Sequence, residues 1–157
     1  MLKFVRNGLE YLCFSLLVTL TLIVFVQVFN RFILKAPLAW SEELATLFFQ
    51  WVVFLGAAVG VKRLNHFGID LLVRNLPGKI RRRLRLLSPL VMGVVAFTLI
   101  IKGIELSVLS QDRLYATLGI SHAWKTAAIP VSGFFMVLYI VQHAIRIWKE
   151  ADEGQNQ

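Results

Sequence analysis

The sequence predicts an all-α integral membrane protein with four transmembrane helices, and three observations support that class: long apolar segments, an apolar composition and one basic connector. Apolar segments cover residues 9–29, 44–61, 86–109 and 127–147 of the 157 residues. Each is close to the roughly 20 helical residues that cross a hydrocarbon core. The chain is 57% apolar, with a mean hydropathy of +0.69, whereas a soluble domain is about 45–50% apolar.

Helices are favoured over barrel strands because the apolar segments are uninterrupted and lack the alternating pattern of a transmembrane strand. A single four-helix domain, 1–157, is therefore expected, with a short amphipathic interfacial helix between the second and third spans. The helices are expected at about 9–34, 41–62, 80–109 and 125–148.

The first two helices are delimited by local signals. The first apolar segment is too long for a cleaved signal peptide and no Ala-x-Ala-like site follows it, so a retained anchor is expected. Pro37 favours a turn after this helix. The second helix is expected to begin at Ser41, a good N-cap residue, with Glu42 and Glu43 in its positively polarised first turn.

The connector between the second and third helices is strongly basic. Eight of the 17 Lys and Arg residues lie within 62–85, and short basic loops stay in the cytoplasm. Both termini are then cytoplasmic too, and membrane orientation explains the net charge of +8 without nucleic acid. Apolar residues at helical spacing within 69–76 predict the interfacial helix. Phospholipid headgroups are the expected partners of six basic residues: Arg74, Lys79, Arg81, Arg82, Arg83 and Arg85.

Lys102 and Glu105 are charged residues within the third apolar segment. A charge at the bilayer centre costs roughly 2.5–3.5 kcal/mol on insertion scales, and an i, i+3 ion pair lowers that cost. Two interpretations stay open. The residues form a proton or ion relay, or they pair with each other or with a partner subunit near the outer interface; the second is favoured.

The histidines, the single cysteine and the glycines give no strong sign of a cofactor or of catalysis. Haem needs two facing imidazoles at similar depth. Only His66 and His143 share a membrane side, and His66 follows its helix. One cysteine, Cys13, excludes an intramolecular disulfide. The sequence has neither an HExxH motif nor a phosphate-binding glycine loop, so we expect no enzyme and no cofactor.

Several motifs together resemble a known family. Trp40-Ser-Glu-Glu-Leu, Trp51, Gly56-Ala-Ala, Lys62-Arg63 and His66-x-x-x-Asp70 are similar to the small membrane subunit, DctQ-like, of tripartite ATP-independent periplasmic (TRAP) transporters. The likeness extends over the helix layout, the length and the basic inner connector. Ser121 is a departure from the proline that often follows an isoleucine in this family.

The resemblance implies a scaffold for a partner rather than an independent transporter. The implied partners are a large membrane subunit, which carries substrate and coupling sodium, and a periplasmic binding protein for an organic acid such as a dicarboxylate or sialic acid. The implied location is the bacterial inner membrane. Partner packing is expected at Trp40, Glu42, Glu43, Trp51, Gly56 and Gly60. The small-xxx-small pattern of Gly56 and Gly60 permits close approach of another helix. Contact with the binding protein is expected at Tyr115, His122 and Trp124.

Two other functions remain open from the residues alone. A self-dimerising small exporter needs an acid deep in the bundle, whereas Glu10 lies near a helix end and Glu105 has its own lysine. A membrane anchor of a redox complex would hold haem or quinone, for which the histidine positions offer little support. The scaffold function is preferred.

Overall fold

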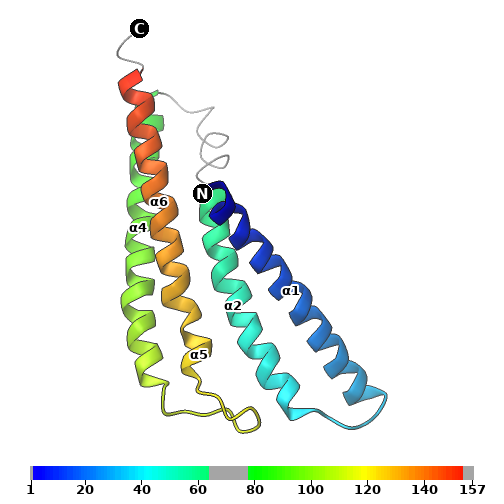
Figure 1. Cartoon of the computed structure of the whole chain (residues 1–157). Coiled ribbons are helices and arrows are strands. Elements are labelled where there is room, and N and C mark those ends of the chain that lie inside the picture. Colours follow the sequence, from blue (N-terminus) through cyan, green and yellow to red (C-terminus); the bar gives the residue numbers. More distant parts are fainter. Residues whose placement is uncertain (1, 64–77, 154–157) are drawn as a thin grey trace.

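The computed structural model describes residues 2–63 and 78–153, with side chains described for 8–63 and 89–145. The long elements in this part of the chain are the helices α1 (Leu2–Phe32), α2 (Ala39–Arg63), α4 (Gly78–Leu109) and α6 (Ala128–Glu153), and a single turn forms α5 (Ala123–Thr126) (Figure 1). Each long helix contains a stretch that is long and apolar enough to cross a membrane. The predicted all-α class with four long apolar helices is confirmed.

Part of the predicted inner connector lies outside the described residues. This applies to the interfacial helix and to Arg74, which fall within 64–77. The backbone of 78–88 is helical and continues into the apolar part of α4, but the side chains of Lys79 and of the four arginines at 81–85 are not among those described. Their lipid contacts remain predictions.

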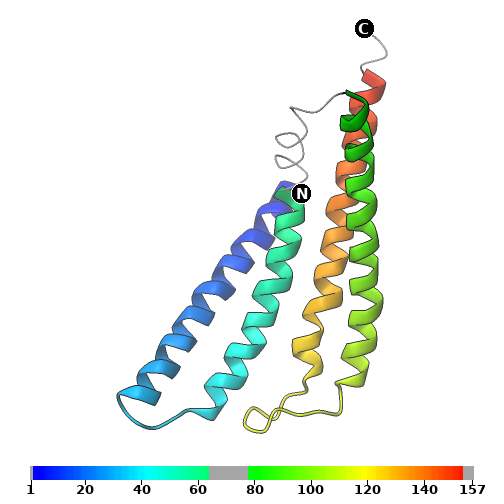
Figure 2. The ribbon, with the colours of Figure 1, turned by 180° about the vertical axis from the view of Figure 1, so that it is seen from behind.

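The four helices form an open row in the order α1, α2, α6, α4. In this row α1 packs mainly on α2, α2 on α6, and α6 on α4. Figures 1 and 2 show α1 and α4 at the two edges, with the connectors 33–38 and 110–122 at one end. We call this the outer end, following the predicted orientation. The start of α1 and the end of α6 lie at the opposite end, called the inner end (Figure 1).

The turn between α1 and α2 is tight, and the second helix begins two residues before its predicted start. Lys35 adopts a left-handed backbone conformation with φ 50°, which reverses the chain ahead of Pro37. The Ser41 hydroxyl donates to the Leu38 carbonyl at 2.6 Å. Ser41 therefore lies inside the first turn of α2, which begins at Ala39, rather than capping it from outside.

The helices α4 and α6 approach each other closely, and two glycines permit this contact. A Cβ added at Gly133 would lie 2.9 Å from Ile100 Cγ1 and 3.0 Å from the Ala96 carbonyl oxygen. A Cβ added at Gly103 would lie 2.6 Å from Pro130 Cδ. These separations are shorter than ordinary van der Waals contact, so each helix contributes one glycine against which the other helix packs.

An ion pair joins α1 to α2 near the inner end. Lys62 Nζ lies 2.5 Å from Glu10 Oε1, and Arg63 Nη2 lies 3.5 Å from Glu10 Oε2. Lys62 is only 8% exposed. Because a buried charge is costly without a counter-charge, the Glu10 carboxylate stabilises this end of the row. Farther toward the outer end, Cys13 contacts α2 through the Val52 carbonyl at 3.8 Å.

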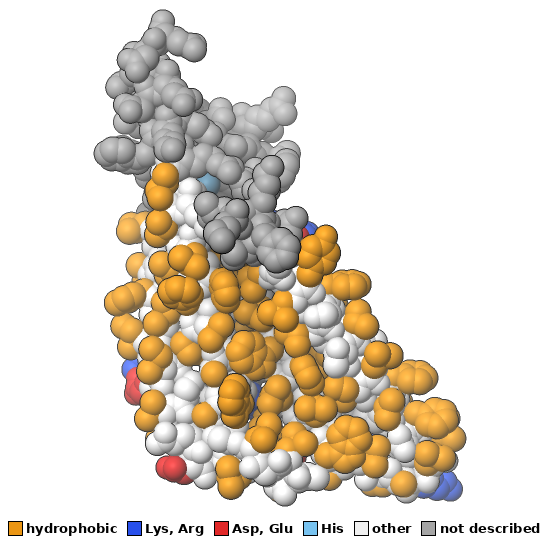
Figure 3. Space-filling view, viewed as in Figure 1, with side chains coloured by type: hydrophobic (Ala, Val, Ile, Leu, Met, Phe, Trp, Pro, Cys, Tyr) orange, Lys and Arg blue, Asp and Glu red, His pale blue; other side chains and the backbone are white. Residues whose placement is uncertain are grey.

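Most of the surface is apolar, and the core is small. The buried cluster centres on Leu55 and Ala58 of α2, Ala96 of α4, and Met136 and Tyr139 of α6. None of the most apolar 18 residues of α1 is buried. Figure 3 shows hydrophobic side chains spread over the described helices on the face in view. Such a surface suits lipid and membrane partners rather than water.

Candidate outer-face site

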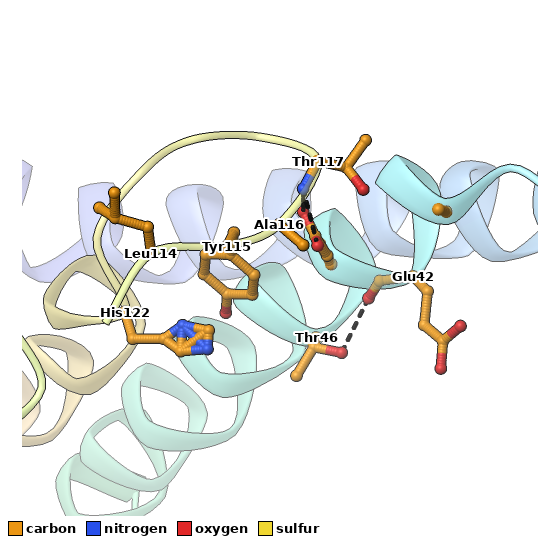
Figure 4. A pocket seen from close by; sticks show the side chains of 9 residues that line it. Glu42, Thr46, Leu114, Tyr115, Ala116, Thr117 and His122 are labelled. Carbon is orange, nitrogen blue, oxygen red and sulfur yellow. Dashed lines mark hydrogen bonds between the residues drawn. The ribbon is translucent and has the colours of Figure 1, made fainter. Parts of the chain in front are cut away.

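A pocket of about 550 Å³ lies at the outer end, between the start of α2 and the connector 110–122, which we call the outer loop (Figure 4). It brings together two groups of residues that the sequence placed in separate roles, Glu42 and Glu43 with Tyr115 and His122. The whole lining consists of Ala39, Glu42, Glu43, Thr46, Leu114, Tyr115, Ala116, Thr117 and His122.

The outer loop is ordered by its own backbone. Leu114 and Ser121 form an antiparallel bridge, and the His122 amide donates to the Arg113 carbonyl at 2.8 Å. The Tyr115 amide donates to the Ile120 carbonyl at 2.9 Å. Gly119 closes the turn with φ 65°, a conformation that side chains other than glycine rarely adopt. The loop is therefore a short hairpin-like arch.

Glu43 fixes this arch to α2. The Thr117 amide donates to both carboxylate oxygens of Glu43 at 3.1 Å, and the Leu118 amide donates to Oε2 at 2.9 Å. Hydrogen bonds to a charged acceptor are stronger than neutral ones. The carboxylate thus satisfies two successive backbone amides at the tip of the arch. Figure 4 shows the dashed hydrogen bond at the Thr117 amide.

Tyr115 and His122 form the polar wall of the pocket. Their rings are tilted, with centroids 4.0 Å apart, and Tyr115 is 6% exposed. The Tyr115 hydroxyl and His122 Nδ1 are buried and have no hydrogen-bond partner among the described residues. Burial, with a smaller contribution from the Glu43 charge, raises the pKa of the Tyr115 phenol. Tyr115 therefore stays neutral at pH 7, and its hydroxyl can both donate and accept a hydrogen bond.

The remaining predicted outer residues are distributed around this pocket. The Glu42 carboxylate points away from Tyr115 and His122, while its carbonyl accepts a hydrogen bond from Thr46 Oγ1 at 2.8 Å (Figure 4). Trp124 is 65% exposed, and Trp40 is also exposed. An exposed aromatic ring at the outer end is typical of the membrane interface.

The predicted partner residues further along α2 have different surroundings. Trp51 Nε1 donates to the Trp124 carbonyl at 3.1 Å, so this indole is engaged within the chain. A Cβ added at Gly56 would meet only Cys13 Sγ, at 3.8 Å, and one added at Gly60 would meet nothing within 4 Å. There is room within the chain for a side chain at either glycine. Their role in partner packing remains a prediction.

Metal binding finds no support in the part of the chain with described side chains, where no group of three or more His, Cys, Asp or Glu residues is placed to hold an ion. The expectation that the chain needs no cofactor stays a prediction. The outer-face site contains four groups capable of hydrogen bonding: the Tyr115 hydroxyl, the His122 ring and the carboxylates of Glu42 and Glu43.

Comparison with known proteins gives a consistent result along most of the chain. Residues 20–150 match the family described as "Tripartite ATP-independent periplasmic transporters, DctQ component". The sialic acid TRAP transporter small permease protein SiaQ of Vibrio cholerae is 31% identical over 147 residues, which is 94% of this chain and 85% of that protein.

Two further relatives differ in length and in the substrate that they are named for. The sialic acid TRAP transporter permease protein SiaT of Haemophilus influenzae is 33% identical over 141 residues, covering 90% of this chain but 23% of that protein. The C4-dicarboxylate TRAP transporter small permease protein DctQ of V. cholerae is 30% identical over 92 residues, covering 59% of this chain and 39% of that protein.

Proposed function

The chain belongs to the DctQ family of small permease components of TRAP transporters, and from that membership we propose that it is the membrane scaffold for a large transport subunit. The predicted family is confirmed. The prediction that the chain is not an enzyme is confirmed with it, because members of this family are transporter components. The chain is a multi-pass membrane protein. The redox anchor and the self-dimerising exporter are set aside with this membership.

One observation carries the scaffold proposal. A segment similar to 90% of this chain makes up only 23% of the permease protein SiaT, so a counterpart of this chain occurs built into a much larger permease. The open row of helices supports the same function, because α1 and α4 each pack mainly on one neighbour. Edge helices of this kind are available to pack against a membrane partner.

The substrate and its coupling ion are assigned to the partner subunits. Relatives named for sialic acid and for C4-dicarboxylates have nearly the same identity to this chain, 31% over 147 residues and 30% over 92 residues. We therefore propose an organic acid of one of these two types as the substrate, with sodium bound in the large subunit. This chain would bind neither of them.

The outer-face site is proposed to contact the periplasmic binding protein. Tyr115, His122 and Trp124 lie at the outer end, and Tyr115 and His122 line a pocket that a docking side chain could enter. This assignment needs the outer end to face the periplasm, with both termini in the cytoplasm of a bacterial cell and the chain in its inner membrane. The basic residues at 79–85 would then meet the inner-leaflet phospholipids.

The test is uptake in a bacterial strain that lacks its own organic-acid transporters. The large subunit and the binding protein of the same transporter are expressed with or without this chain, and sodium-driven uptake of labelled sialic acid and succinate is measured. We expect uptake of one substrate to need all three proteins and to fall to background without this chain. Equal uptake with and without it would contradict the proposal.

A further inference from the structure

The edge helix α4 carries an exposed ion pair within its membrane span. Lys102 Nζ lies 2.7 Å from Glu105 Oε2, and the two side chains are 70% and 65% exposed. The span of α4 runs from Pro89 to Leu109, so the pair lies one to two helical turns inside its outer limit. At the same level Gly103 packs against Pro130 of α6.

The pair lies on the side of α4 that no other described helix covers. Ala96 and Gly103 are buried against α6, and their helical positions define the packed side of α4. Glu105 falls on the opposite side together with Val94 and Thr98, which are also exposed. Figure 3 shows a blue and a red group side by side at the α4 edge, within a largely hydrophobic surface.

Lipid is an unfavourable environment for this ion pair. A single charge near the bilayer centre costs roughly 2.5–3.5 kcal/mol on insertion scales, and less near an interface. An i, i+3 pair on an exposed helix recovers only about 0.2–0.5 kcal/mol in water. The long lysine side chain can reach toward the headgroups, whereas Glu105 starts three residues nearer to them but has the shorter reach. Polar groups of a partner at the same depth would lower this cost.

The other edge helix, α1, is suited to lipid. Its outward side carries large apolar residues such as Val18, Phe25 and Phe29. Its exposed hydroxyl groups donate to carbonyls of their own helix, as Thr19 does to Ser15 and Thr21 does to Leu17. Its one acidic residue among those described, Glu10, faces α2 and pairs with Lys62. The two edges therefore differ in polarity although neither is covered.

We propose that the large membrane subunit packs on the Lys102–Glu105 side of α4 and presents polar or charged groups of complementary sign at that depth, while the outward side of α1 faces lipid. This inference rests on the proposed function. It goes beyond that function by choosing one edge of the row, and it moves the main contact away from the α2 residues that the sequence suggested. The partner proposed for this side of α4 is the large subunit, not a second copy of this chain.

The first test exchanges the two charges, Lys102→Glu with Glu105→Lys. The exchange keeps the i, i+3 pair, the net charge and the apolar surface, so a pair that only faces lipid would tolerate it. We expect at least a tenfold loss of large subunit co-purifying with the tagged chain, at unchanged amounts of the chain in the membrane. Wild-type co-purification by the exchanged variant would overturn the proposal.

The second test keeps both native charges and so does not depend on how the exchanged variant folds. A photo-crosslinking amino acid is placed at Val94 on the outward side of α4 or, as the matched control, at Val18 on the outward side of α1. Both valines are exposed. We expect adducts with the large subunit from position 94 and with lipid from position 18.

The outcomes separate this inference from the proposed function. Adducts with the large subunit from position 18 alone, or with a second copy of this chain from position 94, would overturn the choice of the α4 edge. Either result would leave the scaffold function standing if the large subunit still co-purifies with the unmodified chain. Absence of the large subunit from the unmodified sample would instead contradict the scaffold function itself.

Discussion

Replacing Gly103 or Gly133 with alanine is expected to destabilise the protein by about 1–3 kcal/mol, the usual cost of overpacking a well-packed contact. The new methyl group at position 103 would lie 2.6 Å from Pro130 Cδ and 2.8 Å from the Pro130 backbone nitrogen. At position 133 it would lie 3.0 Å from the Ala96 carbonyl oxygen. Backbone atoms cannot move aside as a flexible side chain can, so α4 and α6 must separate.

The measurement is the unfolding midpoint of the purified chain in mild detergent, followed by tryptophan fluorescence. Gly93→Ala is the matched control, because Gly93 lies in α4, as Gly103 does, and an added Cβ there would meet nothing within 4 Å. The double variant should cost less than the sum of the single ones, since both substitutions disturb one contact. Midpoints for Gly103→Ala and Gly133→Ala equal to that of Gly93→Ala would contradict the close approach of α4 and α6.

Glu43→Ala is expected to release the tip of the outer loop from α2. The variant removes the acceptor of the Thr117 and Leu118 amides. Hydrogen bonds to charged groups contribute about 1.5–3 kcal/mol each, with less expected for exposed ones. Because Tyr115 and His122 are carried by the same loop, the pocket should lose its shape. The chain should still assemble with the large subunit, since α4 and α6 are untouched.

Hydrogen exchange of the loop amides tests this prediction directly. Exchange at Thr117 and Leu118 should speed up by at least tenfold, and uptake should need more binding protein to reach half its maximal rate. Glu42→Ala is the control, because the Glu42 carboxylate points away from the loop (Figure 4). Slow exchange at both amides in Glu43→Ala would show that the loop is held by its own bridge between Leu114 and Ser121.

The four helices could be predicted because lipid leaves few alternatives. An apolar segment of about 20 residues must satisfy its backbone internally, so composition determined the class before any detail of packing. The turn after α1 was predicted from Pro37, whereas the left-handed conformation of Lys35 was not. A charged, unbranched residue gives no local sign of that backbone state.

The packing glycines could not be identified from spacing. Gly56 and Gly60 have the small-xxx-small pattern, yet within this chain an added Cβ at either position would meet no crowded neighbour. Gly103 and Gly133 lie on different helices, and their contact depends on how α4 crosses α6. Such pairing between segments 30 residues apart is not encoded in any local motif. It becomes visible only when both helices are placed.

The outer-face site was predicted in pieces. Tyr115 and His122 were assigned to the outer loop, and Glu42 and Glu43 to the start of the second helix, but nothing in the sequence joined them. The joining contact is between Glu43 and two backbone amides, and backbone amides carry no residue identity. Gly119 has a positive φ, and a glycine at this point could have indicated the tight turn from the sequence.

The central claim is that this chain is a scaffold bound to a large transport subunit, and affinity purification of the tagged chain from native membranes tests it most directly. The membranes are solubilised in mild detergent, and the accompanying proteins are identified and quantified by mass spectrometry. The scaffold function predicts a large TRAP membrane subunit in near-equal amount. A homodimer alone, or a complex with redox subunits and a visible haem absorbance, would contradict it.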